Sequence, residues 1–360
     1  MSTIVSIGTA VPAYCHRQTD ILQFMQGVYG LNEVEKRKLR FLYSQSGIAQ
    51  RHSVLADYGR PISEWKFYPP TENLEPFPTL EQRMAVFNKQ APLLSIDAIR
   101  NCLNGVVHDS DITHLITVSC TGMSAPGLDL QVLELMDAGK NIMRTSVNFM
   151  GCYAAIHALK MADAFCNSNK AAKVLIVCAE LCTLHFQREH TLDNITSSLL
   201  FGDGAAAVLV ASDDSGLKGV HINHFYSEIV PKGKRDMAWE LSSTGFLMQL
   251  SGYVPDLIEE DFEPVVAQCL QQTGWAKEEV THWCLHPGGK RILEAVQQSI
   301  GLQPEQLQPS YNVLQQYGNM SSATVLFVLK ELLQSKGKKN IFGAAFGPGL
   351  TIETFTASAP

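Results

Sequence analysis

The sequence predicts an α/β layered fold in which one structural unit occurs twice. Short, continuous apolar runs at residues 115–118, 174–177 and 205–210 are separated by helical stretches. Runs of this length, rich in aliphatic side chains, are typical of strands buried on both faces of a sheet. Because helical sequence alternates with these strands, we expect helices to cover the faces of the sheet.

An internal repeat is the second observation, since four pairs of segments recur in the same order. The first three pairs have nearly the same separation, and the fourth has a shorter one. We therefore predict two copies of one unit, residues 1–215 and 216–360, which meet near a turn at 213–216. If an approximate two-fold axis relates the copies, the starts of equivalent helices lie close together. The paired segments are Thr113-His114-Leu115 with Thr281-His282-Trp283, Gly151-Cys152 with Gly318-Asn319, the strand after Lys173 with the strand after Lys339, and Phe201-Gly202-Asp203-Gly204 with Phe346-Gly347-Pro348-Gly349.

The N-terminal elements follow from local signals. The apolar start predicts a strand at residues 3–8, and Thr19 or Asp20 can cap a helix that begins at Ile21. Polar helical sequence continues over residues 33–42.

The segment 59–78 is unusual because it holds five prolines and four aromatic residues. This composition predicts a long irregular loop that packs its aromatic side chains on a surface. The next helix is expected to run from Thr79 or Glu81 to Leu103, with an interruption at Pro92.

Composition excludes several classes of protein. A net charge of -7 without a long basic run argues against nucleic acid as a partner. No apolar run reaches the roughly 18 residues of a membrane span, and the start has no signal-peptide pattern. Nine cysteines without framework spacing predict reduced thiols in the cytoplasm. Cys178 and Cys182 lack the further ligands of a zinc pattern, so no metal site is expected.

Cys152 is the first candidate functional residue. It follows a small-residue turn and opens a long, mostly apolar helix. Unpaired N–H groups and the partial positive charge at a helix N-terminus favour the thiolate, which is the nucleophilic form of cysteine. The alternative is a small buried cysteine without chemistry, which is common.

Two further residues join Cys152 through the repeat and the strand order. Asn319 occupies the equivalent position of the second copy, and His286 follows a second-half strand, where α/β folds place their chemistry. Cysteine, histidine and asparagine together allow two reactions. One is thiol-dependent hydrolysis, with histidine as the base and asparagine orienting it. The other is decarboxylative carbon–carbon bond formation, with histidine and asparagine as neutral donors to an enolate oxygen.

Five motifs occur in order along the chain: Gly151-Cys152, Leu200-Phe201-Gly202-Asp203-Gly204-Ala205-Ala206, His286-Pro287-Gly288-Gly289, Tyr317-Gly318-Asn319-Met320-Ser321-Ser322-Ala323 and Phe346-Gly347-Pro348-Gly349. They resemble the motifs of type III polyketide synthases, the chalcone synthase-like enzymes, and the chain looks like a bacterial member. The resemblance covers nearly the whole chain and implies a thiolase-like fold, which is a duplicated five-layered α/β/α/β/α unit, in a homodimer.

The resemblance implies a role for each matching residue. Cys152 would hold the starter acyl group and the growing chain, and His286 would keep the thiolate ionised and then assist decarboxylation. Asn319 would orient the malonyl thioester and bind its enolate oxygen. Phe201 would be the gatekeeper between the coenzyme A tunnel and the cavity, although an ordinary core phenylalanine is the alternative. The turn 347–349 would shape the cavity wall.

Substrate-contacting residues follow from the same resemblance. Two positions depart from the plant pattern: His185 stands where plant enzymes have threonine, and Ala125 stands where they have a methionine that reaches into the partner's cavity. The second change is expected to open space. The expected cavity-lining residues are Cys120, Thr121, Met123, His185, Gly245, Phe246, Ser321, Gly347 and Pro348. The expected coenzyme A contacts are Arg51, Gly288, Gly289, Lys290 and Arg291. For the three cations among them, the alternative is an ordinary surface charge.

The sequence thus predicts an acyltransferase that condenses a starter acyl-CoA with several malonyl-CoA units and then cyclises the chain. The CoA thioesters are substrates, and no cofactor is expected. An alkylresorcinol or alkylpyrone from a fatty starter is the product we expect, because of the space at Ala125, although a pyrone from another starter fits the sequence equally. The alternatives are a single-round β-ketoacyl synthase that uses a carrier protein, and a thiol hydrolase or inactive scaffold on the same fold.

Overall fold

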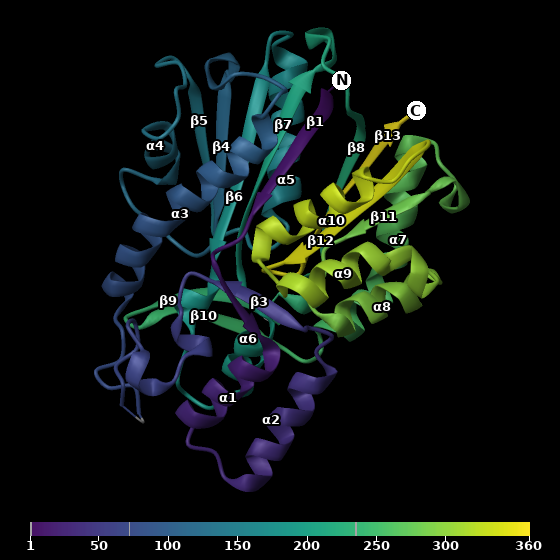
Figure 1. Ribbon diagram of the computed structural model, residues 1–360. Helices are drawn as coiled ribbons and strands as arrows, with labels where there is room; N and C mark the ends of the chain where they lie inside the picture. The colour runs from purple at the N-terminus through teal and green to yellow at the C-terminus, as the bar shows by residue number, and fades with distance from the viewer. Residues whose placement is uncertain (1, 72, 235) are drawn as a thin grey trace.

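The centre of the computed structural model, which describes residues 2–71, 73–234 and 236–360, is a nine-stranded sheet made of two half-sheets (Figure 1). The strand order is β11-β12-β13-β8-β1-β7-β6-β4-β5. The half-sheets meet where β1 pairs with β8 through the short stretch Ser2–Ile4. The strands are β1 (Ser2–Ala10), β4 (His114–Ser119), β5 (Met143–Asn148), β6 (Lys173–Leu181), β7 (Asp203–Ser212), β8 (Val220–Ile229), β11 (His282–Leu285), β12 (Lys339–Gly347) and β13 (Thr351–Ala359).

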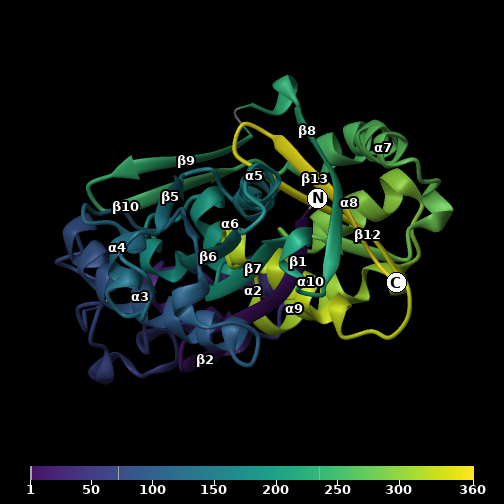
Figure 2. The same cartoon turned by 90° about the horizontal axis from the view of Figure 1, so that it is seen from above.

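Helices form three layers around the two half-sheets. Helices α5 (Ala154–Ser168) and α10 (Thr324–Leu333) lie between the half-sheets, where their apolar side chains form one core with strands of both halves (Figure 2). Helix α3 (Leu80–Leu103) covers the outer face of the first half-sheet, and α7 (Val254–Thr273) with α8 (Lys290–Ile300) covers the second. The predicted five-layered α/β/α/β/α fold is confirmed.

The repeat is visible in matching hydrogen bonds at the start of β4 and β11. The Thr113 hydroxyl accepts the N–H of Lys173 at 2.9 Å, and the Thr281 hydroxyl accepts the N–H of Asn340 at 2.9 Å. The backbone N–H of each threonine donates to the carbonyl of the same partner. In each copy, these bonds align two parallel neighbouring strands in the same way, β4 with β6 in the first copy and β11 with β12 in the second. The connection between the copies runs from β7 through a short 3-10 turn, Asp213–Ser215, to β8.

The copies differ in what precedes the helix of the middle layer. In the first half, α4 (Leu128–Leu133) and the edge strand β5 come before α5. Among the described residues of the second half, α8, the 3-10 turn Pro304–Leu307 and α9 (Gln308–Tyr317) take that place without a matching strand. The second copy reaches Asn319 from a helix, whereas the first reaches Cys152 from a strand.

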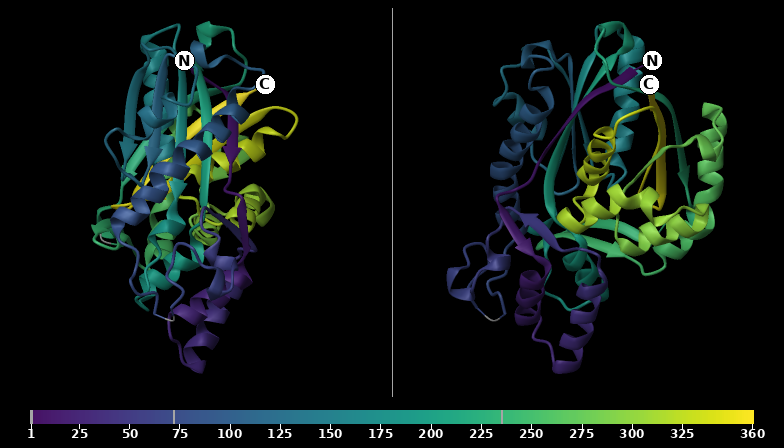
Figure 3. Two further views of the ribbon diagram at one scale, coloured as in Figure 1. Left: turned by 60° about the vertical axis from the view of Figure 1, so that its left-hand side comes forward. Right: turned by 45° about the vertical axis from the view of Figure 1, so that its right-hand side comes forward.

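The N-terminal segment forms a projection that stands away from the central sheet (Figure 3). Helix α1 (Gln18–Val28) begins three residues before the predicted Ile21, and α2 (Glu33–Gln45) begins where expected. The side chain of Asn32 caps α2 by accepting two backbone N–H groups. The short strands β2 (Tyr14–Arg17) and β3 (Gln50–Ser53) pair at the base of this projection.

The segment 59–78 is irregular, as predicted, and packs on the body of the protein. Tyr68 and Leu74 are buried, and Tyr68 lies against the rings of Phe24 and Phe186. The carboxylate of Asp57 accepts the N–H groups of residues 66–68, which fixes the path of the loop. The expected interruption of α3 at Pro92 is wrong, because the structure has one helix through this proline.

Several strands have no counterpart in the sequence prediction, namely β5, β8, β13 and the hairpin of β9 (Met237–Ser242) and β10 (Gly245–Leu250). Their sequences mix polar and apolar side chains, so they lack the continuous apolar runs that revealed β4, β6 and β7. The hairpin supplies Met237, Trp239 and Met248 to the wall of the cavity beside Cys152.

Candidate active site

Cys152 lies in the turn between β5 and α5, two residues before the helix begins. Gly151 makes this turn with a φ of 80°. A Cβ atom at Gly151 would stand 2.1 Å from Cδ of Pro348, so only glycine fits here. The N–H of Gly151 donates to Sγ of Cys120 at 3.0 Å. The thiol of Cys152 is thereby held just before the N-terminal end of α5, whereas the sequence predicted it in the first turn of the helix.

Asn319 connects Cys152 to two other segments. Its Oδ1 and Nδ2 lie 3.9 Å and 4.0 Å from Sγ of Cys152, and Nδ2 donates to the carbonyl of Gly288 at 3.2 Å. Its backbone pairs with Leu200 and Gly202, on either side of Phe201. The predicted proximity of the two helix starts is confirmed, since Cys152 and Asn319 are neighbours although they are far apart in sequence.

His286 directly follows β11, and its N–H donates to the carbonyl of Ala344 at 2.9 Å. The side chain is 1% exposed, and neither ring nitrogen has a hydrogen-bond partner among the described residues. Buried polar atoms without a partner are rare and mark places where a ligand or a reacting group can bind. The loop that His286 begins continues to Gly288, whose carbonyl is held by Asn319. Burial lowers the pKa of His286 to about 3, so the imidazole is neutral.

The environment of Cys152 also favours a neutral group. Burial raises the pKa of its thiol to about 12, and hydrogen bonds with Ser321 and Asn319 act in the opposite direction. Sγ lies 3.8 Å from Oγ of Ser321. A thiol and a neutral imidazole are therefore the forms that burial favours, which differs from the ionised pair implied by the resemblance.

A buried carboxylate, Glu180 on β6, supports the walls of the site. It accepts the N–H of Cys120 and the hydroxyl of Thr121, both at 2.9 Å, and the hydroxyl of Ser322 at 2.5 Å. Burial raises the pKa of Glu180 to about 7, and these donors oppose the rise. Glu180 thus ties the end of β4 to the segment after Asn319.

The thiol of Cys152 opens into a small cavity. Its volume is about 20 Å³, which is space for one or two water molecules. The predicted residues that line it are Cys120, Thr121, Phe201, Ser321 and Pro348. Gly347 lies beside it, because a Cβ there would stand 3.3 Å from the backbone nitrogen of Cys152. The other residues of the wall are Gly151, Cys182, Met237, Trp239 and Met248.

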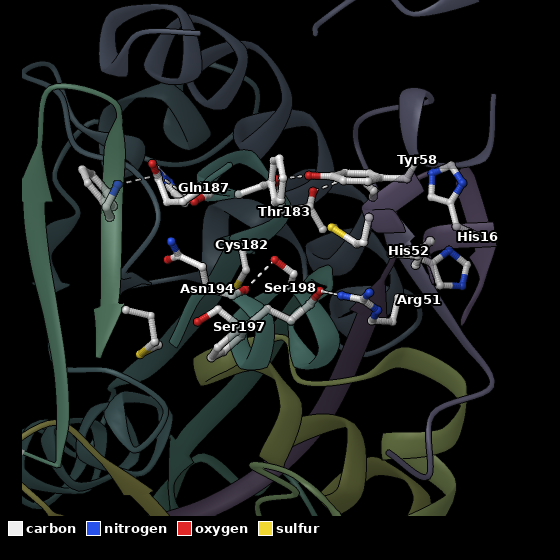
Figure 4. Close-up of a pocket in the computed structure, with 18 of the residues that line it drawn as sticks. His16, Arg51, His52, Tyr58, Cys182, Thr183, Gln187, Asn194, Ser197 and Ser198 are labelled. Carbon is white, nitrogen blue, oxygen red and sulfur yellow. Dashed lines mark hydrogen bonds between the residues drawn. The ribbon is translucent and has the colours of Figure 1, made fainter. Parts of the chain in front are cut away.

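A second cavity, with a volume of about 40 Å³ by the same measure, lies next to the first (Figure 4). Two residues predicted for the acyl cavity, His185 and Phe246, line this one. Their rings stack in parallel with centroids 4.2 Å apart. Side chains of α6 (Leu192–Leu200), of the 3-10 turn Cys182–His185 and of β3 meet here, with Ile21 and Met25 of α1.

Two predictions about the cavity wall, those at Met123 and Gly245, are wrong for this chain. Met123 is 50% exposed and lines neither cavity. Ala125 is exposed too, and the space expected there belongs to a partner's cavity, so that expectation stays a prediction. Gly245 faces Gln187 and Arg83 instead, and only its neighbour Phe246 reaches a cavity.

The expected contact of Arg51 with coenzyme A phosphates is also wrong, because the guanidinium is only 3% exposed. Nε donates to the Gln18 side chain at 3.0 Å, and Nη1 donates to the carbonyl of Phe201. Arg51 therefore fixes the position of Phe201 from inside the protein. By contrast, Lys290 and Arg291 at the start of α8 are at the surface, next to Gly289, which packs against Leu200.

Residues that the sequence prediction missed are Glu180, Cys182, Met237, Trp239 and Met248. The hairpin members alternate along β9, with Met248 directly opposite Trp239, so a period-two pattern was present in the sequence. The buried Glu180 gave no local signal, because its partners come from segments distant in sequence.

Among residues 2–71, 73–234 and 236–360, no group of three or more potential ligands is arranged to hold a metal ion. In the same part of the chain, no helix combines the length and apolar character that crossing a membrane requires.

Comparison with known proteins identifies the class. The family description "Chalcone and stilbene synthases, N-terminal domain" matches residues 1–214, and "Chalcone and stilbene synthases, C-terminal domain" matches residues 221–359. The chain belongs to this family. It is a type III polyketide synthase, an acyltransferase, and the family match favours this function over the single-round synthase considered above.

Solved structures agree with this assignment. PKS-I from the brown alga Ectocarpus siliculosus has a TM-score of 0.92 and 26% identity, with 100% of this chain and 98% of that chain covered. The C-terminal type III polyketide synthase domain of Steely1 from Dictyostelium has a TM-score of 0.91 and 26% identity over 99% and 98% of the two chains. A type III pentaketide synthase from Neurospora crassa has a TM-score of 0.87 and 23% identity over both full chains, which supports the fold alone.

Proposed function

We propose that Cys152 accepts the starter acyl group from coenzyme A and carries the growing chain. The observation that carries this proposal is the Asn319 amide, which lies between Sγ of Cys152 and the carbonyl of Gly288, in the loop that begins with His286. The ring nitrogens of His286 are buried and have no hydrogen-bond partner among the described residues. His286 takes the thiol proton as Cys152 attacks the thioester carbonyl. The coenzyme A thiolate then leaves and receives this proton.

In the second step, malonyl-CoA occupies the same place while the acyl group stays on Cys152. Its thioester oxygen accepts the N–H of neutral His286 and the amide N–H of Asn319. Carbon dioxide leaves, and the two donors stabilise the enolate oxygen without a charge to neutralise. The low pKa of His286 suits this role because a neutral imidazole keeps one N–H for donation. The enolate carbon attacks the Cys152 thioester, and the lengthened chain leaves on coenzyme A for reloading.

We propose that coenzyme A enters between the loop before α8 and the end of α2. A Cβ at Gly47 would meet the side chain of Lys290 at 3.5 Å, so these segments adjoin at the surface. Lys290 and Arg291 are the exposed cations there, paired loosely with Glu294 at 3.6 Å and Asp256 at 3.9 Å. Such exposed pairs are weak and can exchange for phosphate groups.

We propose a cyclised product, such as an alkylresorcinol or a pyrone. The fatty starter predicted from the sequence rests on space at Ala125, a position expected to face the partner's cavity, and Ala125 is exposed in this chain. This starter stays a prediction, which the panel of starters below tests.

We also propose that the protein is a homodimer that works in the cytoplasm. The edge strand β5 leaves backbone groups unpaired along one side and exposes Met143 by 57%. Met123 and Leu135 are exposed near the same edge of the first half, and apolar exposure beside an open strand favours a partner. All nine cysteines are unpaired, which supports a reducing compartment.

The test is to incubate the protein with malonyl-CoA and starters from acetyl- to palmitoyl-CoA plus p-coumaroyl-CoA, and to measure products by mass spectrometry. We expect products longer than the starter by two or more ketide units. Cys152→Ala should reduce product to below about 1%, whereas Cys166→Ala, in the helix α5 that follows Cys152, should leave it unchanged. Extended product from Cys152→Ala would disprove the covalent role.

A second test concerns His286. If its imidazole accepts the thiol proton, His286→Ala should slow the alkylation of Cys152 by iodoacetamide at pH 7 by roughly tenfold to a hundredfold. Peptide mapping isolates the signal of Cys152. His282→Ala, at the start of the strand β11 that precedes His286, is the control and should not change the rate. An equal rate in all three proteins would remove His286 from the loading step.

A further inference from the structure

Helix α2 carries an exposed row of side chains that mixes apolar and cationic residues. The helix buries Leu39 and Tyr43 against the rest of the protein. Residues three or four positions apart share one face of a helix, so the face away from these two presents a continuous row. Every member of this row is exposed. We call it the α2 stripe, and its residues are Val34, Arg37, Lys38, Phe41, Leu42 and Gln45.

The apolar members of the α2 stripe are well exposed. Phe41 is 65% exposed, Val34 is 59% exposed and Leu42 is 41% exposed. Apolar side chains scattered singly on a surface are ordinary, whereas several on one helix face form a patch of the kind that marks an interaction site. The α2 stripe therefore favours contact with an apolar environment outside the chain.

The cations of α2 have their charges available. Among the described residues, no ion pair or side-chain hydrogen bond engages the charged groups of Arg37, Lys38 and Arg40. Residues 36–56 contain no aspartate or glutamate, although the whole chain has a net charge of -7. The region around the α2 stripe is thus locally basic on an acidic protein, which suits an anionic partner.

The two acidic residues of α2 lie in its first turn and are already engaged. Glu33 pairs with Lys36 at 3.0 Å, and the carboxylate of Glu35 accepts the N–H of Asn32 at 2.9 Å. Carboxylates at the start of a helix also complement its dipole. They leave the remaining cations of the helix without a local counter-charge.

The position of α2 lets the stripe reach a flat surface. The helix belongs to the N-terminal projection, which stands away from the central sheet (Figure 3). Its stripe faces outward because Leu39 and Tyr43 occupy the inner side. A convex helix with cations beside exposed apolar side chains is typical of segments that lie on a membrane surface. A bilayer, unlike a protein that binds a helix, requires no groove around it.

We propose that the α2 stripe docks the protein on the surface of a membrane that contains anionic lipids. Phe41 and Leu42 enter the boundary between the headgroups and the acyl chains, and Arg37 and Lys38 contact lipid phosphates. The contact is peripheral, because no helix of the described part of the chain is long and apolar enough to cross a membrane. The docking goes beyond the proposed reaction and does not depend on it.

Docking through α2 also sets the direction that one end of the protein faces. A Cβ at Gly47, two residues beyond α2, would stand 3.5 Å from Cδ of Lys290. This is where coenzyme A thioesters enter in the proposed function. A docked protein therefore holds that entrance close to the bilayer, into which long acyl chains partition. This consequence alone rests on the proposed function.

The experiment measures binding to vesicles without any substrate, so it is independent of catalysis. The full-length protein is sedimented with phosphatidylcholine vesicles and with vesicles of phosphatidylcholine and phosphatidylglycerol, at low and at high salt. Two variants alter the α2 stripe: the double variant Arg37→Gln, Lys38→Gln removes two cations, and Phe41→Ser removes the largest apolar side chain. Thermal melting shows that each variant is folded, as expected for exposed positions.

Matched controls make the same changes elsewhere on the surface. Leu93→Ser removes a leucine of α3 that is 51% exposed. The double variant Arg100→Gln, Lys170→Gln removes two cations whose side chains are 74% and 85% exposed. The net charge of this double variant equals that of the double variant in α2.

We expect the wild-type protein to bind the vesicles with phosphatidylglycerol, less at high salt, and not to bind phosphatidylcholine alone. Arg37→Gln, Lys38→Gln should lower the binding constant by about tenfold to thirtyfold, since each cation near an anionic surface contributes about fivefold. Phe41→Ser should lower it by about threefold to tenfold. Both controls should leave it unchanged.

Four results would overturn the inference. They are no binding to anionic vesicles at low salt, unaltered binding in both folded α2 variants, and equal weakening by the controls. The fourth is binding of a soluble acidic acyl carrier protein through the α2 stripe without any vesicle binding, which would make the partner a protein. Stripe-dependent vesicle binding without any extended product from the panel of starters would support docking and disprove the polyketide function, so the two failures are distinct.

Discussion

In both halves of the protein, the same backbone feature precedes the functional residue, but the segments that follow this residue differ. In each half, a glycine with positive φ precedes the functional residue: Gly151, at 80°, before Cys152 and Gly318, at 67°, before Asn319. In the first half the helix begins two residues after Cys152, whereas in the second a 3-10 turn, Ser321–Ala323, intervenes before α10. The side chains that each half presents are also different. One half carries the thiol, and the other carries the amide and the imidazole.

This difference shows how a duplicated unit can acquire an asymmetric site. The repeated fold places two helix starts side by side, and it does so whatever residue follows each glycine. In the proposed mechanism, the identity of that residue divides the work, with acyl transfer on one side and enolate stabilisation on the other. The predictions below test this division.

The largest effect is expected from removing the amide of the second half. Asn319→Ala should lower the rate of malonyl-CoA decarboxylation and condensation by about 10²–10³, because one donor to the enolate is lost. Acyl loading of Cys152 should change by less than about tenfold, since the donor acts mainly in the second step. Radiolabelled carbon dioxide release and intact-mass loading measure the two steps.

Asn223→Ala is the control for that prediction, because Asn223 is an exposed residue hydrogen-bonded to Ser358. It should change neither step. If Asn319→Ala slowed loading as much as decarboxylation, the division of work between the halves would be wrong.

The shared glycines should be indispensable to both halves. At Gly318, a Cβ would stand 2.7 Å from the carbonyl oxygen of Leu200, and at Gly151 it would stand 2.1 Å from the Pro348 ring. Backbone strain and the clash together should lower the free energy of unfolding by about 2–5 kcal/mol in either alanine variant. Chemical denaturation measures this loss.

The matched control is Gly105→Ala, since Gly105 has a φ of 72° but nothing within 4 Å of its Cβ position. It should cost only the strain of about 1 kcal/mol. Equal losses in all three variants would show that close packing of the two turns is unimportant.

A smaller effect concerns Glu180, which links the halves by binding Cys120 and Ser322. Its pKa is raised from 4.5 to about 7 in the folded protein, so the folded state binds the proton more tightly than the unfolded state does. The resulting stabilisation is complete below pH 4.5 and is lost as the pH rises through 7. Relative to Glu180→Gln, the wild-type protein should lose about 3 kcal/mol of unfolding free energy between pH 4.5 and pH 8. Parallel pH dependences in both proteins would show that Glu180 does not titrate in this range.

The smallest effect is expected at the surface of the second half. The double variant Lys290→Ala, Arg291→Ala should raise the KM for malonyl-CoA by roughly threefold to tenfold, and less at high salt, because exposed charges are screened. The kcat should stay the same. Lys336→Ala, a surface change away from α8, should leave both constants unaltered. A lower kcat with an unchanged KM would place these cations in the chemistry.

The sequence by itself determined the features that depend on local pattern. Continuous apolar runs marked the buried strands β4, β6 and β7, and an alternation of strands and helices indicated the layered fold. The repeat placed Cys152 and Asn319 together, because a duplicated unit brings equivalent positions to a common axis. The motifs around these residues also gave the family.

Only the tertiary structure decided which side chains form the cavity and which lie outside it. Met123 and Arg51 have the residue types expected of a cavity wall and a phosphate contact, yet one is exposed and the other is buried under Phe201. Glu180 gave no comparable signal, and the period-two pattern at Trp239 is that of a strand and does not indicate a site, although both residues contact the site. The physical reason is that burial and hydrogen-bond partners depend on segments distant in sequence, and a local pattern does not contain their positions.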